Sequence, residues 1–177
     1  MTRLGAIAVS LAAMLLGASL APAAIAQQNE SPSERVSAED VPESVAAQVQ
    51  CGTDPHDVTR RRFAGGYVFA WECASNNANW IMALIYADDT DGANARLLRF
   101  PGPPGSAAAE ELSNVRWYPA AREVTGLFVN PEETICRTEA RWRLAGHPPD
   151  ARLIFWRETR DSDGKRGWRI VVDPRRK

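Results

Sequence analysis

The stretch from Gly66 to Phe100 constrains the fold most, because its pattern predicts three successive antiparallel strands. From Gly66 to Cys73, aromatic residues and Cys alternate with Val, Ala and Glu, which is the two-residue period of a β-strand. Trp80 to Ala87 is apolar at both parities, and a strand of this kind is usually central and covered on both faces. A buried helix is the alternative for this second segment, but its short length and its flanking Asn and Asp clusters favour the strand.

Turn signals divide the following residues into further strands. Asp91-Gly92 predicts the turn before a return strand over 95–100. Residues 101–109, with three Pro and two Gly, are predicted as a loop between two halves of one sheet system. Hairpins are expected over 114–129 and over 152–172.

The strand predicted from Ile135 to Leu144 has the clearest alternation in the chain. Its pattern indicates a half-buried antiparallel strand with a charged outer face. The inward set is Cys136, Thr138, Ala140, Trp142 and Leu144, and the outward set is Arg137, Glu139, Arg141 and Arg143.

The chain as a whole predicts an all-β fold, an antiparallel hairpin-built sandwich or barrel of about eight strands with one short N-terminal helix. The helix is expected over residues 41–50, with Asp40 as its cap and Pro42 in its first turn. Residues 53–63 show no period and are predicted as a loop. The intervals between strands leave no room for crossover helices, which argues against a parallel sheet.

The first 39 residues carry targeting features rather than a fold. Residues 1–26 combine Arg3, an apolar run and the cleavage pattern Ala24-Ile25-Ala26, and predict a signal peptide. An uncleaved anchor is the alternative, but the run is short and rich in Ala and Gly. Residues 27–39 are predicted as a flexible tether, and 40–174 as a single β-rich domain. We expect a periplasmic or secreted bacterial protein with no membrane span after signal cleavage.

Charge and cysteine content limit the function classes. The chain has 21 basic and 22 acidic residues, and this balance argues against a nucleic-acid binder. An exported chain meets an oxidising compartment, so Cys51, Cys73 and Cys136 predict at least one disulfide, and their spacing leaves all three single pairings open. The absence of a Cys-x-x-Cys or His-rich pattern gives a zinc site little support, and we expect no cofactor.

A series of short motifs occurs in a specific order along the chain. AWEC ends at Cys73 and is followed by a polar link, an apolar strand, an Asp-rich turn and RLLRFP, which ends at Pro101. YPAAREV starts at Tyr118, and TIC ends at Cys136 before Trp142 and Gly146. In this order the motifs resemble the bacterial family catalogued as domain of unknown function 1176. The resemblance covers residues 48–172 and corresponds to the C-terminal part of the longer members.

The resemblance implies an exported protein of unknown activity. Two departures from the family pattern lie in the link 74–79 and in residues 160–164, where a Cys that often precedes the last strand of the family is absent. Because this usual partner of Cys136 is missing, the resemblance implies a disulfide between Cys51 and Cys73.

Single residues that could carry chemistry have simpler interpretations. His56 and His147 lie beside Pro or Asp in turns, which favours solvated loop histidines over catalytic ones. Cys136 is expected to be a buried inert thiol rather than a nucleophile. The Asp clusters at 88–91 and 161–163 lack the calcium-loop spacing and favour plain turns.

Two groups of side chains are candidates for binding. Arg137, Arg141 and Arg143, joined by Arg152 or Arg157 from a neighbouring strand, are a candidate surface for an anion or an acidic partner. A solvated face that discourages edge pairing is the simpler interpretation. Of the six tryptophans, Trp71, Trp80, Trp142 and Trp168 are predicted in the core, while Trp117 and Trp156 are candidates for lining a glycan or peptide groove.

These observations favour a non-enzymatic binding or interaction module, whose partner would be another envelope protein or an acidic ligand. A cell-envelope hydrolase with acids from Glu132, Glu133 or Asp150 is the alternative. A purely structural envelope protein is the third hypothesis.

Overall fold

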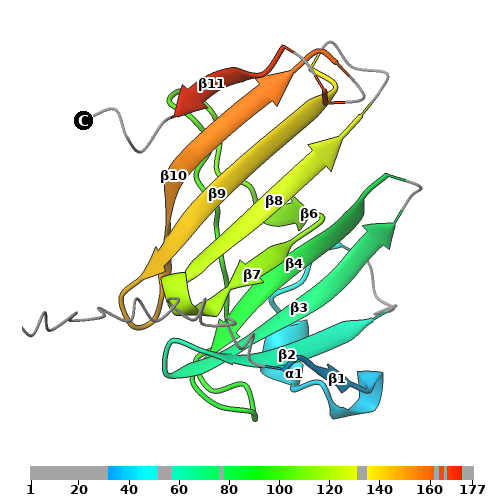
Figure 1. The fold of residues 1–177 in the computed structure, drawn as a ribbon. Coiled ribbons are helices and arrows are strands. Elements are labelled where there is room, and N and C mark those ends of the chain that lie inside the picture. Colours follow the sequence, from blue (N-terminus) through cyan, green and yellow to red (C-terminus); the bar gives the residue numbers. More distant parts are fainter. Residues whose placement is uncertain are drawn as a thin grey trace, which may run out of the picture.

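The computed structural model describes residues 32–51, 57–75, 78–130, 135–161, 164–165 and 167–172, and these form two antiparallel sheets packed as a sandwich (Figure 1). The N-terminal sheet has the order β1-β2-β3-β4-β5, with β6 also paired to β4, and the C-terminal sheet has the order β11-β10-β9-β8-β7. The all-β prediction is confirmed, and of its two alternatives the structure has the sandwich.

The elements have the following bounds. The strands of the N-terminal sheet are β1 (Glu34–Val36), β2 (Val58–Phe63), β3 (Gly66–Ser75), β4 (Trp80–Ala87), β5 (Arg96–Leu97) and β6 (Glu111–Ser113). Those of the C-terminal sheet are β7 (Arg116–Tyr118), β8 (Glu123–Val129), β9 (Arg137–Ala145), β10 (Asp150–Thr159) and β11 (Arg169–Val172). The helices are α1 (Glu43–Ala46) and the 3-10 turns η1 (Ala38–Asp40) and η2 (Pro119–Ala121).

The central strands β3 and β4 confirm the prediction from their two-faced pattern. Val68, Leu84 and Tyr86 point toward the C-terminal sheet and join the core between the sheets. Phe69 and Ile85 point the other way and pack with Val45 of α1. Both parities are apolar because the second sheet covers one face and the N-terminal segment covers the other.

The loop prediction for residues 53–63 is wrong over 58–63, which form β2. This strand pairs with β3 through a tight turn in which Ala64 and Gly65 both have positive φ (52° and 90°). The arginines of β2 obscure its strand pattern, because they are charged residues whose guanidinium groups nevertheless pack over aromatic rings. The Arg60 guanidinium lies 5.7 Å from the centroid of the Tyr67 ring, and the Arg61 guanidinium lies 5.2 Å from that of Trp117.

The N-terminal helix is shorter than predicted and differently capped. α1 covers four residues, and its N-cap is Pro42 with no side-chain cap hydrogen bond. Asp40 belongs to η1, where its carboxylate accepts a hydrogen bond from the Ser37 hydroxyl, so its predicted role as the helix cap is wrong.

The tether prediction for residues 27–39 is wrong where β1 forms. This short strand pairs with β2, and Val36 at its end is buried. Ion pairs hold the polar residues, with Arg60 2.8 Å from Glu34 and Arg35 3.0 Å from Asp57. Residues 1–31, including the predicted signal peptide, lie outside the described part, in which no helix is both long and apolar enough to span a membrane.

The change from one sheet to the other occurs later than predicted. After β5, the backbone of Phe100 pairs with Ala109 and closes the base of the 101–108 loop. β6 then returns to the N-terminal sheet, so the boundary lies at Asn114, between β6 and β7, and not within 101–109.

Two asparagine side chains join the sheets at this boundary, and we call them the asparagine clamp. The Asn79 amide donates to the Val129 carbonyl oxygen (2.6 Å), and its oxygen accepts from the Val129 N–H (2.8 Å). The Asn114 amide donates to the carbonyl oxygens of Ala78 (2.9 Å) and Leu127 (2.8 Å). β4 and β8 therefore meet through side chains that imitate backbone pairing.

The pairing of the cysteines and the burial of the tryptophans can also be compared with the sequence predictions. Cys51 and Cys73 form the disulfide implied by the family resemblance, with 5.2 Å between their Cα atoms, and Cys136 is a buried thiol outside the disulfide whose Sγ donates to the Arg160 carbonyl oxygen (3.1 Å). Trp71 and Trp142 are in the core as predicted, but Trp80 is 65% exposed. The core prediction for Trp80 is wrong because the C-terminal sheet does not cover its end of β4. Trp117 is buried, and Trp156 and Trp168 are half-buried.

Candidate functional site

The outer face of the C-terminal sheet carries the basic stripe predicted from the sequence. Arg141 and Arg143 extend from β9 on the side opposite the core residues Ala140 and Trp142. The register places Arg152 of β10 directly opposite Arg143. Arg116 of β7 and Arg141 are both paired with Thr125 of the intervening strand β8. We call the set Arg116, Arg141, Arg143 and Arg152 the arginine face.

One carboxylate serves this face among the described residues. Glu123 Oε1 lies 2.7 Å from Arg143 Nη2, and its other oxygen lies 3.8 Å from Arg141 Nη1. The Glu123 side chain is 10% exposed, so the two guanidinium groups largely enclose it. Arg116 and Arg152 have no ion-pair partner in the described part of the chain. Like charges directly opposite each other on neighbouring strands are destabilising, so the Arg143–Arg152 pair favours binding of an anion.

The structure separates Arg137 from the arginine face. Arg137 is the first residue of β9, four residues from Arg141, which corresponds to about 13 Å along a strand. Its guanidinium packs against Gly164, where an added Cβ would lie 2.8 Å from it. Arg157 is paired with Glu139 on the neighbouring strand. Of the predicted basic stripe, Arg141, Arg143 and Arg152 therefore form one surface.

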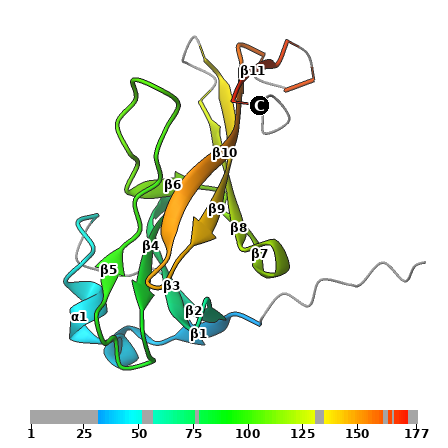
Figure 2. The same ribbon diagram turned by 90° about the vertical axis from the view of Figure 1, so that its left-hand side faces the viewer.

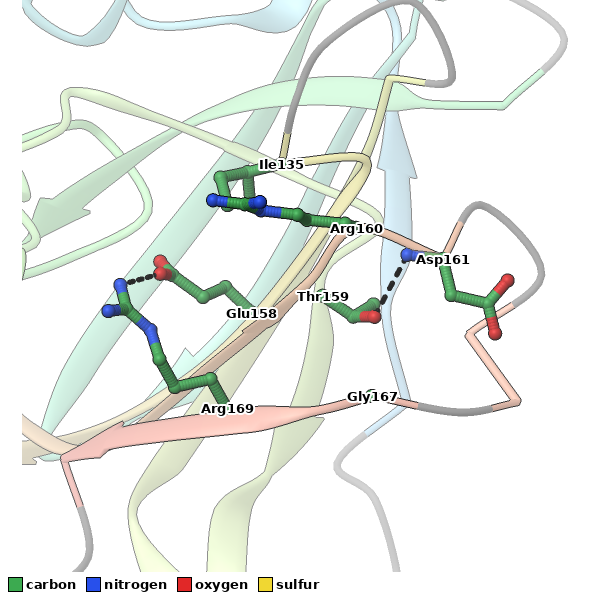
Figure 3. Close-up of a pocket in the computed structure, with 7 residues that line it drawn as sticks. All are labelled: Ile135, Glu158, Thr159, Arg160, Asp161, Gly167 and Arg169. Atoms are coloured by element: carbon green, nitrogen blue, oxygen red, sulfur yellow. Dashed lines mark hydrogen bonds and ion pairs between the residues drawn. The ribbon is translucent and has the colours of Figure 1, made fainter.

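A pocket of about 590 Å³ lies where β10 ends and β11 begins (Figure 3). Glu158 in this cavity is ion-paired with Arg169. The Asp161 N–H donates to the Thr159 hydroxyl oxygen (3.0 Å), and the Asp161 carboxylate points away from Glu158 (Figure 3). These two carboxylates do not face each other as a catalytic acid and base would.

The predicted acids of the hydrolase alternative are not brought together in the described residues. The Asp150 side chain is 89% exposed, 3.4 Å from Arg96, and the shallow cavity beside it is otherwise lined by Arg96, Arg99 and apolar or backbone atoms. Glu132 and Glu133 lie outside the described residues. The hydrolase hypothesis therefore gains no support from the part of the chain that the structure describes.

Comparisons with known proteins assign neither a family nor a function to the chain. No family model, no curated protein and no solved structure matches the chain. The resemblance to the family of unknown function stays a prediction that depends on the order of its motifs.

The Asp-rich turn at 88–91 uses its carboxylates to hold its own backbone. Asp89 Oδ1 accepts from the N–H groups of Asp91 (3.0 Å) and Ala93 (2.9 Å), and Asp88 accepts from the Asn94 amide (2.7 Å). These contacts are those expected of a plain turn. The other cluster of possible metal ligands contains Cys51, Cys73 and Glu111, but both sulfur atoms are engaged in the disulfide.

Sequence reasoning missed the contact that His147 makes. Its Nδ1 lies 2.9 Å from the hydroxyl of buried Tyr86, and its Nε2 lies 4.0 Å from Asp88. Burial raises the pKa of the Tyr86 hydroxyl, Asp88 acts in the same direction, and Arg96 and Arg122 oppose it. A raised pKa keeps this hydroxyl protonated, so Tyr86 is a hydrogen-bonding group and not an activated nucleophile. His56 lies outside the described residues.

This pKa shift predicts a loss of stability at alkaline pH. The phenol ionises near pH 10.0 in the unfolded chain and at a higher pH in the folded protein. The unfolded chain therefore loses this proton first, and the free energy of unfolding should fall as the pH rises above about 10 towards the folded pKa, while the full contribution is present below that window. Urea denaturation of the protein and of Tyr86→Phe between about pH 8 and 11 measures this. Equal pH slopes for both proteins would contradict the prediction.

An apolar cavity of about 220 Å³ lies between the sheets, beneath the loop 101–109. Residues from both sheets and from the loop line it, among them Phe100, Leu112, Phe128, Ala140, Trp142 and Trp156. Trp156 was one of the two tryptophans considered for a groove, and the structure places it at this cavity. Apart from its small residues, the sequence of the loop 101–109 gives no indication of a binding role.

Proposed function

We propose that the chain is an exported, non-enzymatic binding module of the periplasm or the extracellular space, and that it docks an acidic protein partner on the arginine face. The observation that carries this proposal is the charge of the face, where Arg141 and Arg143 pair with Glu123 and no ion-pair partner of Arg116 or Arg152 lies among the described residues. The signal-peptide pattern and the Cys51–Cys73 disulfide support the compartment. The resemblance to the exported family of unknown function is part of the same proposal.

The composition of the face favours a protein over a small inorganic anion. Phe155 is paired with Arg141 in the sheet register, and Leu127 projects on the same side beside Glu139. Both are partly exposed. Arginine together with aromatic and aliphatic residues is typical of protein interfaces, and the guanidinium group binds carboxylates in a bidentate geometry. An Asp- or Glu-rich segment of a partner is the occupant that complements this surface.

The test measures retention of the purified protein on immobilised poly-glutamate. The double variant Arg143→Ser, Arg152→Ser should bind about tenfold more weakly at low salt, since an exposed charge pair contributes up to about 1 kcal/mol. The difference should shrink as salt is raised, because salt screens exposed charges.

The matched control removes the same charge elsewhere. Arg62 and Arg99 are exposed and lie outside the C-terminal sheet, so Arg62→Ser, Arg99→Ser should bind like the unchanged protein. An equal loss in both double variants, or no loss in either, contradicts the proposal. Retention on immobilised polyphosphate but not on poly-glutamate contradicts the protein partner.

A further inference from the structure

An open pocket of about 190 Å³ lies on the inner face of the N-terminal sheet, at the end that the C-terminal sheet leaves uncovered. Figure 1 shows this end of β3 and β4 projecting past the short strand β7, and Figure 2 shows the C-terminal sheet rising away from β1 and β2. Glu72 of β3 is paired with Met82 of β4, which contacts the core between the sheets, and Trp80 lies two residues earlier on the same face. Asp57 and Thr59 complete the lining.

Trp80 gives this pocket an aromatic wall that the fold itself does not bury. The residue is 65% exposed, more than any other large apolar residue that the structure describes. Its backbone is held in place, because the Trp80 N–H donates to Asn114 Oδ1 of the asparagine clamp (3.1 Å). An indole on a fixed strand beside a pocket offers a large contact area to a ligand at a small cost in ordering.

Glu72 is a half-buried carboxylate that makes neither an ion pair nor a side-chain hydrogen bond with the residues that the structure describes. The glutamates on the strands of the C-terminal sheet, in contrast, all pair with arginine, namely Glu123, Glu139 and Glu158. The neighbour of Glu72 across the sheet is Asp57, since the Glu72 N–H donates to the Asp57 carbonyl oxygen (3.0 Å). Like charges opposite each other on neighbouring strands are destabilising, so this pair favours a bound cation.

The one arginine that pairs with Asp57 among the described residues leaves the charge of Glu72 uncompensated. Arg35 lies 3.0 Å from Asp57, but its side chain is 80% exposed, and exposed pairs of this kind contribute little. Glu72 shares the pocket with the apolar side chains of Trp80 and Met82. A cation with an apolar body therefore complements the lining better than a strongly hydrated ion does.

The polar groups of the pocket do not suit a metal ion or a primary ammonium group. Calcium takes about six to eight oxygen ligands, and the lining supplies two carboxylates and one hydroxyl. Within the described ranges, the group of three closely placed possible metal ligands is Cys51, Cys73 and Glu111, which is a different cluster. A primary ammonium needs acceptors for three N–H groups, and the Asp57 carboxylate already accepts from Arg35. A quaternary ammonium has no N–H groups and is attracted to the face of a tryptophan ring.

We propose that this pocket binds a small quaternary ammonium ion that is free in solution, with its N-methyl groups against Trp80 and Met82 and its charge beside Glu72. The volume of about 190 Å³ is below the roughly 300 Å³ at which pockets for drug-sized ligands begin, so the ion is small. This site is separate from the arginine face, which lies on the other sheet and has the opposite charge.

The test titrates the purified, isotope-labelled protein with choline and follows the indole N–H signals by NMR. The Trp80 signal, assigned through its absence in Trp80→Phe, should shift and saturate. The comparison ligand is 3,3-dimethyl-1-butanol, which has the shape of choline with carbon in place of the charged nitrogen. It should bind at least about fivefold more weakly, because it lacks the attraction to the carboxylate and to the ring. Ethanolamine, a primary ammonium, should also bind more weakly than choline.

Variants separate the charge from the apolar contacts. Glu72→Gln should lower the affinity for choline about fivefold and leave the affinity for the neutral alcohol within about twofold. Trp80→Leu should weaken choline more than the alcohol, since the cation–π attraction is lost with the ring. Glu111→Gln makes the same change of charge on the same sheet outside the pocket, and it should change neither affinity.

Four results would overturn the proposal. Equal affinity for choline and the alcohol would show that charge has no part in binding, and equal losses in Glu72→Gln and Glu111→Gln would show that the charge acts only at long range. Displacement of choline by millimolar calcium would assign the pocket to an inorganic cation. Retention of the protein on phosphatidylcholine vesicles without binding of free choline would assign it to a lipid headgroup instead of a solute.

Discussion

Replacing Gly66 with alanine should lower the free energy of unfolding by about 3 kcal/mol or more. A Cβ added at this residue would lie 2.3 Å from the Ala87 carbonyl oxygen and 2.4 Å from the Tyr86 hydroxyl. The carbonyl belongs to the central strand β4 and the tyrosine is fully buried, so neither can move without disturbing the core. Overpacking of this kind typically costs about 1–3 kcal/mol, and two simultaneous clashes place this case at the upper end. Urea denaturation of both proteins measures the difference.

A second glycine provides the control for this substitution. Gly105 has φ +90° and no atom within 4 Å of an added Cβ, so Gly105→Ala tests backbone strain without a clash. It should cost about 1 kcal/mol. The double variant Gly66→Ala, Tyr86→Phe should recover part of the loss, since it removes the Tyr86 hydroxyl, one of the three atoms within 3.0 Å of the added Cβ. A loss at Gly66 no larger than that at Gly105 would contradict the packing argument.

The sequence predicts the strands whose alternation reflects simple burial. β3 and β9 were found because apolar side chains at every second position face a core, and β4 was found because its apolar residues at both parities are covered on both faces. β2 was missed because Arg60 and Arg61 pack over aromatic rings. A pattern that divides residues only into apolar and polar classes counts such arginines as solvent-exposed. β1 was missed because its order depends on backbone pairing with a distant strand rather than on its own composition.

The residues of the candidate sites were likewise predicted only in part from the sequence. Alternation alone places Arg141 and Arg143 on one face, but the pairing register selects Arg152 rather than Arg157, adds Arg116 and leaves Arg137 at the far end of β9. The partner of His147 could not be predicted, because Tyr86 lies 61 residues away in the chain. The inter-sheet cavity depends on where the 101–109 loop settles, and no local pattern determines that position.

The asparagine clamp predicts the second large effect. Asn79→Ala should lower the free energy of unfolding by about 3 kcal/mol, because it leaves both the N–H and the carbonyl of Val129 without their partner. Each buried backbone group left unsatisfied costs about 1–3 kcal/mol. Asn79 is 4% exposed, so water does not readily replace its amide. Asn94→Ala is the control, since Asn94 is exposed and bonds only to Asp88 among the described residues; we expect a cost of about 1 kcal/mol or less.

A double-mutant cycle tests whether the two asparagines act as one unit. The Asn114 amide also contacts the Asn79 side-chain oxygen at 3.3 Å, and the Asn114 oxygen accepts from the Trp80 N–H at 3.1 Å. Removing either residue should therefore loosen the contacts of the other, because they share this junction between β4 and β8. The combined loss in Asn79→Ala, Asn114→Ala should fall short of the sum of the single losses by at least about 0.5 kcal/mol. Strict additivity would mean that each asparagine satisfies its own strand independently, and that the sheets are held together by their apolar core.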